Sequence, residues 1–235
     1  MRKNAGRLIV ALDVPTLREA EALVEALSPE VKTFKIGMEL FTAAGPDGVR
    51  AVLRRGGRVF LDLKFHDIPN TVASACLAAA SLDVFMLNVH ASGGREMMKK
   101  AADALRVRCQ DSKRPILLGV TVLTSLGGAG LKEVGVSSAL PAQVEGLAKL
   151  ARECGLDGVV ASPREVPLLR RTAGADFVIV TPGVRPAWAS RGDQKRVMTP
   201  AEAVAAGADY LVVGRPITQD ADPRAAAARV LDEIG

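Results

Sequence analysis

The chain has 235 residues, and 49% of them are hydrophobic but only 3% aromatic, so it can bury a large core without metal ions or disulfides. Its net charge of +5 is modest, and its basic residues are not interleaved with aromatic ones, which disfavours a nucleic-acid partner. The three cysteines are odd in number and show no CxxC spacing, and no apolar stretch is long enough to span a membrane. These features together predict a soluble cytoplasmic protein.

Short apolar segments alternate with amphipathic segments along the whole chain. The expected strands are residues 8–13, 33–38, 58–64, 83–90, 115–124, 157–162, 176–182 and 209–214. Segments with helical periodicity lie between them, for example at residues 16–27, 70–82, 94–105, 142–154 and 199–207. The last of these begins with "TPAE", which predicts a capping box with proline at the first helical position.

This alternation predicts a parallel sheet with right-handed crossovers. The first and last strand ends, Asp13 and Gly214, are about 200 residues apart, which gives about 29 residues for each of seven repeats. Eight such units close a (β/α)8 TIM barrel, and we predict one such barrel as a single domain over residues 1–235. A doubly wound open sheet is the alternative, but no GxGxxG follows the first strand.

Charged and polar residues collect at the carboxyl ends of the expected strands, where barrels of this kind carry their active sites. These residues are Asp13, Lys35, Asp62, Lys64 and Thr124. Each has a structural explanation when taken alone: Asp13 could cap the next helix, and Lys35 could extend to solvent. Their joint placement on one rim favours a functional role.

Asp62 and Lys64 are two residues apart in one expected strand, so their side chains should point to the same face. A lysine about 4 Å from a carboxylate is stabilised by roughly 4 kcal/mol at an effective dielectric of about 20. Such contacts would keep Lys64 protonated and fixed, which suits a proton donor better than a Schiff-base nucleophile. The residues alone leave imine chemistry open.

The last two strands predict a phosphate site. "VVGRPIT" places the Gly214 N–H and Arg215 at the end of the eighth strand, where such barrels often bind phosphate. The segment after the seventh strand adds Arg185 and Gln194, although arginines there could also belong to a solvated surface loop. No HExxH or comparable cluster surrounds the two histidines, so a metal-free mechanism is favoured.

Six segments resemble the orotidine 5′-phosphate decarboxylases of the shorter bacterial type. They are "LIVALDV", "FKIGMEL", "LDLKFHDIPNT", "VTPGVR", "GDQKRVMTP" and "GRPIT", and they run from the first strand to the last. The resemblance implies a (β/α)8 barrel that converts orotidine 5′-phosphate to uridine 5′-phosphate and carbon dioxide, without cofactor or metal. It also implies a homodimer.

The resemblance further implies a role for each motif residue. Lys64 would protonate C6 as carbon dioxide leaves, and Lys35, Asp62 and Asp67 would complete a charged array. Asp13 and Lys35 would hold the ribose hydroxyls. Asp67 and Thr71 would reach the site from the other subunit. Thr124 would lie near the pyrimidine, and Pro182 would also contact the substrate. The residues that would hold the phosphate are Arg185, Gln194, Gly214 and Arg215.

Three other functions stay open at this stage. A magnesium-dependent sugar-phosphate decarboxylase or aldolase of the same superfamily also uses an aspartate-x-lysine pair. A phosphate-binding isomerase or epimerase would need an acid and a base across the substrate, which the clustered Asp62, Lys64 and Asp67 suit less well. An RNA-associated module is suggested only by the pI of 9.3.

Overall fold

Eight parallel strands close into a barrel in which each strand pairs with the next in chain order and the last pairs with the first. The structure, a computed structural model, describes residues 5–109, 114–189 and 198–235. The strands are β1 (Leu8–Ala11), β2 (Thr33–Gly37), β3 (Arg58–Phe65), β4 (Met86–His90), β5 (Ile116–Val120), β6 (Gly158–Val160), β7 (Val178–Pro182) and β8 (Tyr210–Val213). The prediction of a (β/α)8 barrel is confirmed.

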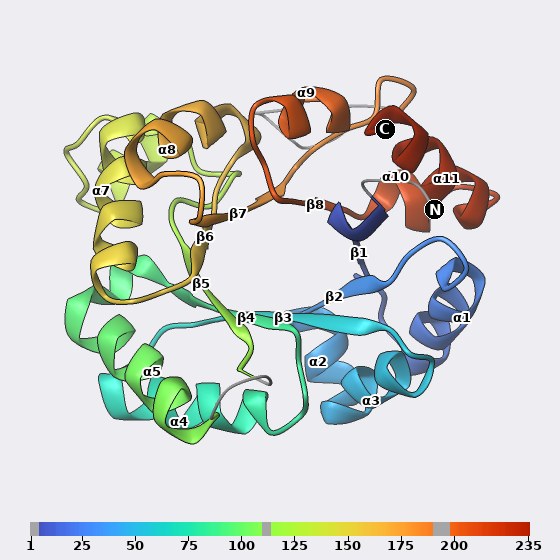
Figure 1. The fold of residues 1–235 in the computed structure, drawn as a ribbon, viewed down its shortest axis with the longest axis horizontal. Coiled ribbons are helices and arrows are strands. Elements are labelled where there is room, and N and C mark those ends of the chain that lie inside the picture. The colour runs from blue at the N-terminus through green and yellow to red at the C-terminus, as the bar shows by residue number, and fades with distance from the viewer. Residues whose placement is uncertain (1–4, 110–113, 190–197) are drawn as a thin grey trace.

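Helices follow the strands and form an outer ring around the barrel (Figure 1). They are α1 (Leu17–Leu27), α2 (Met38–Ala44), α3 (Pro46–Arg54), α4 (Pro69–Ala80), α5 (Gly94–Arg108), α6 (Gly128–Glu133), α7 (Leu140–Glu153), α8 (Val166–Ala173), α9 (Pro200–Ala205), α10 (Arg215–Thr218) and α11 (Pro223–Glu233). Short 3-10 turns lie at η1 (Ala5–Arg7), η2 (Ala91–Gly93) and η3 (Pro163–Glu165).

The capping box expected at the start of α9 is present. The Thr199 hydroxyl accepts a hydrogen bond from the Glu202 N–H, and a Glu202 carboxylate oxygen accepts one from the Thr199 N–H. Pro200 occupies the first turn, where its missing N–H costs nothing. These local contacts begin α9 at the residue that the "TPAE" motif predicted.

Buried side chains form two layers because successive residues of a strand point to opposite faces. On β3, Phe60 points into the barrel, whereas Val59 and Leu61 point outward to the helices. The inner layer consists of Ile9, Ala11, Phe60, Met86, Leu118, Val120, Val160, Val180 and Val212. This apolar layer fills the middle of the barrel, and the charged side chains of Lys35 and Asp62 lie above it toward the carboxyl end.

Five strands, β1, β2, β5, β6 and β8, end one to four residues earlier than the sequence pattern predicted. The ends of β1 and β5 affect two residues of the expected rim. β1 ends at Ala11 and β5 at Val120, so Asp13 and Thr124 lie in the segments that follow the strands and not within them. β5 ends early because its neighbour β6 ends at Val160. The Val160 carbonyl accepts a hydrogen bond from the Thr121 N–H, and beyond that point β6 offers β5 no further pairing.

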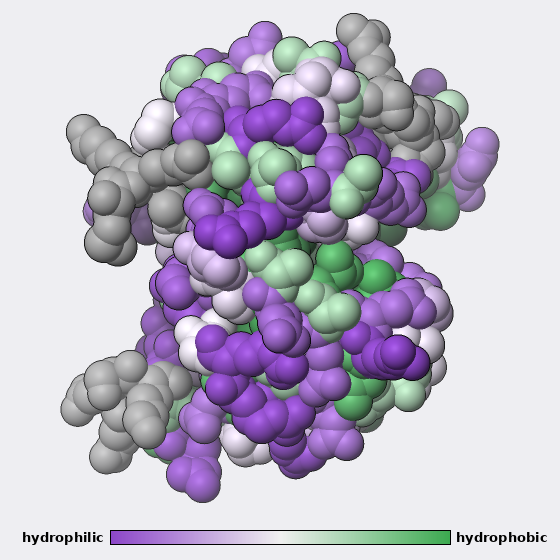
Figure 2. Space-filling model, turned by 90° about the vertical axis from the view of Figure 1, so that its right-hand side faces the viewer, coloured by the Kyte–Doolittle hydropathy of each residue, from purple (hydrophilic) through white to green (hydrophobic). Residues whose placement is uncertain are grey.

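The side of the molecule to the right in Figure 1 is mainly polar. Figure 2 shows this side, on which hydrophilic side chains dominate and hydrophobic ones appear between them near the middle. Within the three described segments, no helix combines the length and the hydropathy that crossing a bilayer requires.

Candidate active site

Four charged side chains form a continuous array at the carboxyl end of the barrel. Lys35 Nζ lies 2.8 Å from Asp13 Oδ1 and 3.4 Å from Asp62 Oδ2. Lys64 Nζ lies 2.8 Å from Asp62 Oδ1. The array therefore alternates in charge, in the order Asp13, Lys35, Asp62, Lys64. The residues expected at this rim from the sequence are brought together.

The middle of this array is buried and its ends are more open. The Lys35 and Asp62 side chains are 10% and 12% exposed, whereas that of Asp13 is 52% exposed. Burial by itself would lower the pKa of Lys35, but the attraction of Asp62 and then Asp13 outweighs it and raises the pKa above its usual value. Lys35 is therefore a fixed positive charge between two carboxylates.

Lys64 enters the array from an irregular position in β3. Its φ of 52° lies in the left-handed region, which residues with a side chain adopt rarely. At the same point the register between β3 and β4 shifts: Leu61 pairs with Leu87, but Phe65 pairs with Val89. β3 thus contains extra residues opposite β4, as in a β-bulge, and this bulge sets the direction of the Lys64 side chain.

Asn88 of β4 fills the gap that the bulge leaves in the strand pairing. Its Oδ1 accepts a hydrogen bond of 2.8 Å from the Lys64 N–H, and its Nδ2 donates one of 2.7 Å to Asp62 Oδ1. The residue has no exposed surface. The motifs did not single out Asn88. The available signal was an amide in the middle of the apolar strand "MLNVH", on the same alternation as Met86.

The array opens into a cavity of about 270 Å³ whose other walls are largely apolar. Lys35, Asp62 and Lys64 line one side, and Thr124 and Pro182 also contribute. The remaining wall residues include Phe60, Val120, Leu123, Val160 and Val212. A cavity of this kind suits one small, partly apolar group beside a row of fixed charges.

A second cavity, of about 150 Å³, lies beside the first and shares Asp13, Lys35, Pro182 and Val212 with it. Arg185, Gly214 and Arg215 line its far side. Arg185 is 9% exposed, and its backbone N–H donates to the carbonyl of Met198. Three of the residues expected to contact phosphate therefore surround one small polar cavity. Gln194, the fourth, lies outside the described residues.

Asp67 and Thr71 do not line either cavity. Both are exposed, and the Asp67 carboxylate accepts a hydrogen bond of 2.6 Å from the neighbouring Ile68 N–H. Asp67 follows β3 directly, and Thr71 lies in the first turn of α4. A single chain therefore assembles the array without the carboxylate of Asp67, which was expected to be part of it.

The two histidines lie next to the array. The His66 and His90 rings are 5.4 Å apart between centroids. Burial lowers the pKa of His90, and the nearby charges of His66 and Lys64 lower it further, against a smaller opposite effect of Asp62. In the part of the chain that the structure describes, no group of three or more His, Cys, Asp or Glu side chains is arranged to hold a metal ion.

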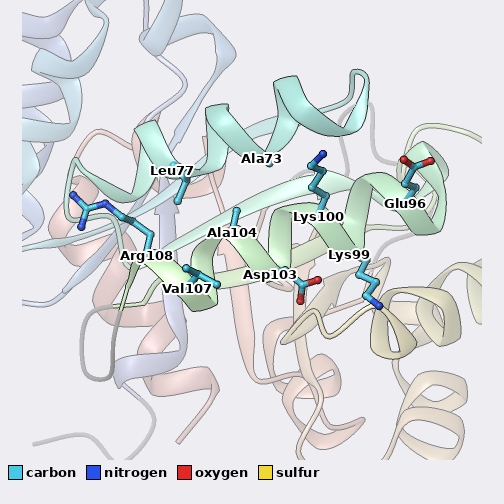
Figure 3. Close-up of a pocket in the computed structure, with 9 residues that line it drawn as sticks. All are labelled: Ala73, Leu77, Glu96, Lys99, Lys100, Asp103, Ala104, Val107 and Arg108. Atoms are coloured by element: carbon cyan, nitrogen blue, oxygen red, sulfur yellow. The ribbon is translucent and has the colours of Figure 1, made fainter.

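A separate groove lies in the helical layer, between α4 and α5 (Figure 3). Ala73 and Leu77 of α4 and Ala104 and Val107 of α5 form its apolar surface, and charged side chains of α5 border it. It shares no lining residue with the two cavities at the strand ends. The charged array therefore defines the candidate active site.

Comparison with known proteins identifies the family of the chain. A family model described as orotidine 5′-phosphate decarboxylase / HUMPS family matches residues 6–230. Proteins named orotidine 5′-phosphate decarboxylase from Moorella thermoacetica and Trichlorobacter lovleyi are 58% and 56% identical to the chain, over 97% of its length and 92% and 95% of theirs. The crystal structure of orotidine 5′-phosphate decarboxylase from Lactobacillus acidophilus superposes with a TM-score of 0.86 at 40% identity, covering 98% of this chain and 99% of that one. The chain therefore belongs to the orotidine 5′-phosphate decarboxylase / HUMPS family.

Proposed function

We propose that this chain decarboxylates orotidine 5′-phosphate to uridine 5′-phosphate and carbon dioxide in pyrimidine synthesis. The names of its relatives support this reaction, and so does one observation above the others. Lys64 Nζ is held 2.8 Å from Asp62 at the wall of a cavity whose other walls are largely apolar. A fixed cation in such surroundings is what a reaction that develops negative charge on carbon requires.

In the proposed reaction the bond between C6 and the carboxylate breaks, and its electron pair stays on C6. That pair occupies an sp2 orbital that cannot delocalise into the ring, so a nearby cation has to stabilise it. Lys64 does so and then gives its proton to C6, and it regains a proton from solvent. Because Asp62 and Asn88 already hold the Lys64 side chain and backbone, little reorganisation accompanies charge development.

Asp62 has a second proposed effect. Its carboxylate shares the cavity with the substrate carboxylate, so the two groups repel each other until carbon dioxide leaves. Lys35 limits this repulsion, because its ammonium group lies between Asp62 and Asp13. We propose that Asp13 and Lys35 also hold the ribose hydroxyls and that Thr124 and Pro182 contact the substrate at the cavity wall.

The second cavity is the proposed phosphate site. Arg185 and Arg215 bring two positive charges to a cavity beside the array, and Gly214 precedes Arg215 at the end of β8. We extend this set to Gln194 from the sequence resemblance alone. Phosphate is remote from the reacting carbon, so its binding energy serves to orient the pyrimidine against Lys64.

We further propose a homodimer in which Asp67 and Thr71 complete the site of the partner. Both residues are exposed in one chain, and Ile68 between them is 66% exposed. Another large hydrophobic side chain after a strand end, Met38, is 60% exposed. Exposed apolar side chains along one rim suit a surface that another subunit covers.

Two broader expectations are part of the same proposal. We propose that one barrel domain carries the whole activity and that the protein works in the cytoplasm. The three cysteines, Cys76, Cys109 and Cys154, are free thiols, which agrees with a reducing compartment.

The test is the loss of orotate absorbance from orotidine 5′-phosphate in excess chelator, with Lys64→Ala as the matched variant. We expect turnover in chelator and none above background in the variant. The nearest alternative is a magnesium-dependent decarboxylase or aldolase acting on sugar phosphates. Activity that appears only when magnesium is restored, or no turnover by a folded wild type, would favour that alternative and refute the proposal.

A further inference from the structure

Asn88 makes two hydrogen bonds that link the backbone and the acid of the reactive pair. Its Oδ1 accepts from the N–H of Lys64, the residue with a φ of 52°, and its Nδ2 donates to Asp62 Oδ1. Lys64 Nζ contacts the same Asp62 oxygen from 2.8 Å. Lys64 is therefore restrained at both ends, at its backbone by Asn88 and at its amine by a carboxylate that Asn88 also holds.

The two partners determine which way the amide points. A backbone N–H can only donate and a carboxylate can only accept, so the reverse orientation would place donor against donor and acceptor against acceptor. Both bonds are short, and Asn88 has no exposed surface, so water does not compete for them. The amide also brings no charge, which matters beside Asp62 and Lys64.

We propose that Asn88 is a positioning residue for the decarboxylation, an inference that rests on the proposed function. Asn88 replaces the strand pairing that is lost at the bulge, and so it holds the Lys64 backbone at a point where β4 offers no regular pairing partner. Through its amide N–H it also sets the plane of the Asp62 carboxylate. The ammonium group then faces the reacting carbon without having to move.

A residue that only stabilises the fold would make the same hydrogen bonds. The experiment therefore has to distinguish a positioning role of Asn88 from a role in stability alone. Asn88→Asp is the informative change because it keeps the shape and one acceptor oxygen. When ionised, the new carboxylate repels Asp62 and offers no donor. When protonated, its O–H can donate to Asp62 while its other oxygen accepts from the Lys64 N–H, which restores both bonds of the amide.

We therefore expect acid to rescue Asn88→Asp. Two carboxylates at this distance share a proton more readily than they both ionise, so kcat relative to wild type should rise as the pH falls from about 8 to about 5. At the upper end kcat should be about 100-fold below wild type, with KM changed far less, because misplacement by about 1 Å costs that much in rate. Asn88→Ala should show a similar loss without the rescue.

Other titratable groups around Asn88 could alter these profiles. Lys64 and Asp62 face it from β3, Lys35 lies behind Asp62 on β2, and His90 and His66 lie nearby. All are present in wild type and in both variants, so dividing each variant by wild type at every pH removes the part of their titration that the substitution leaves unchanged. The comparison of Asn88→Asp with the uncharged Asn88→Ala then isolates the effect of the new carboxylate.

Thr33→Val is the matched control for loss of a buried polar contact inside the same barrel. Thr33 is 1% exposed at the start of β2, where its hydroxyl accepts from Arg58. It lies at the opposite end of β2 from Gly37, and among the described residues the hydrogen bonds of its side chain are to Arg58 and not to the charged array. This variant should lose stability and leave kcat and its pH profile as in wild type.

The melting temperature of each protein, measured over the same pH range, gives a readout that needs no turnover. As the pH falls, the melting temperature of Asn88→Asp should rise relative to that of wild type. The melting temperature of Asn88→Ala should show no such rise. Parallel profiles of Asn88→Asp and wild type, in both rate and melting temperature, would refute the role of Asn88. An acid-dependent gain in melting temperature in a protein that does not decarboxylate orotidine 5′-phosphate would uphold the Asn88 contacts and refute the proposed function instead.

Discussion

Gly37, the last residue of β2, shows how closely the array is packed. Its φ of −93° and ψ of −173° suit any residue, so alanine is compatible with the backbone there. A Cβ at this position would lie 2.8 Å from Lys35 Nζ and 3.2 Å from Asp13 Oδ1. The first of these atoms is the end of a flexible side chain, so it would move away from the new methyl group.

Gly37→Ala should therefore reduce activity more than stability. We expect kcat/KM for orotidine 5′-phosphate to fall by about 10- to 100-fold, because the Lys35 ammonium would shift by a fraction of an ångström or more. The free energy of unfolding in urea should change by less than about 1 kcal/mol. An unchanged kcat/KM would show that the position of Lys35 is not critical.

Gly146 offers the same chemical change away from the site. It lies exposed within α7, and a Cβ there would meet no atom within 4 Å. Gly146→Ala should leave kcat/KM unchanged and stabilise the protein by about 0.5–1 kcal/mol, because glycine loses more backbone entropy than alanine in a helix. The pair of variants separates a steric effect at the array from a general effect of replacing glycine.

At the scale of a single element, β3 combines an apolar strand with a strained end. The left-handed backbone of Lys64 costs about 1–2 kcal/mol for a residue with a Cβ and almost nothing for glycine. Lys64→Gly should therefore be more stable than Lys64→Ala by about 1 kcal/mol in urea unfolding, while both lack the proposed proton donor. At Gly146, by contrast, alanine should be the more stable residue. Greater stability of Lys64→Ala over Lys64→Gly would show that the bulge does not strain Lys64.

The bulge also marks a limit of sequence reasoning about β3. Alternation predicted Asp62 and Lys64 on one face, and their side chains do meet, at 2.8 Å. The backbone at this point is not a regular strand, however, because the φ of Lys64 is 52° and the register with β4 shifts there. The strand pattern records hydrophobicity, and it carries no signal for a bulge that depends on a side-chain amide from the next strand. Asn88 was missed for that reason.

At the scale of the whole molecule, the repeated strand-and-helix pattern was sufficient to predict the barrel. Buried parallel strands read as apolar runs, and in a closed barrel of this kind all carboxyl ends meet at one rim. Asp13, Lys35, Asp62 and Lys64 could therefore be grouped before any coordinates were known. Strand ends were less accurate, since β5 stops where its partner β6 stops, and Thr124 lies beyond it. Contacts that need a second subunit, such as those expected of Asp67, are absent from the geometry of one chain.

Mixed dimers test whether Asp67 acts in the partner's site. Lys64→Ala and Asp67→Ala subunits should each be inactive alone, because every site lacks one group. In a dimer of one with the other, one site has both Lys64 and Asp67 and its counterpart has neither. Random mixing makes half of the dimers mixed, so about a quarter of wild-type activity should return in the orotate absorbance assay.

Mixing Lys64→Ala with Asp62→Ala is the control, because these two residues contact each other within one chain, 2.8 Å apart, and no mixed dimer restores the pair. Rescue by neither mixture would place Asp67 outside the partner's site, since only a residue that crosses the interface can be complemented.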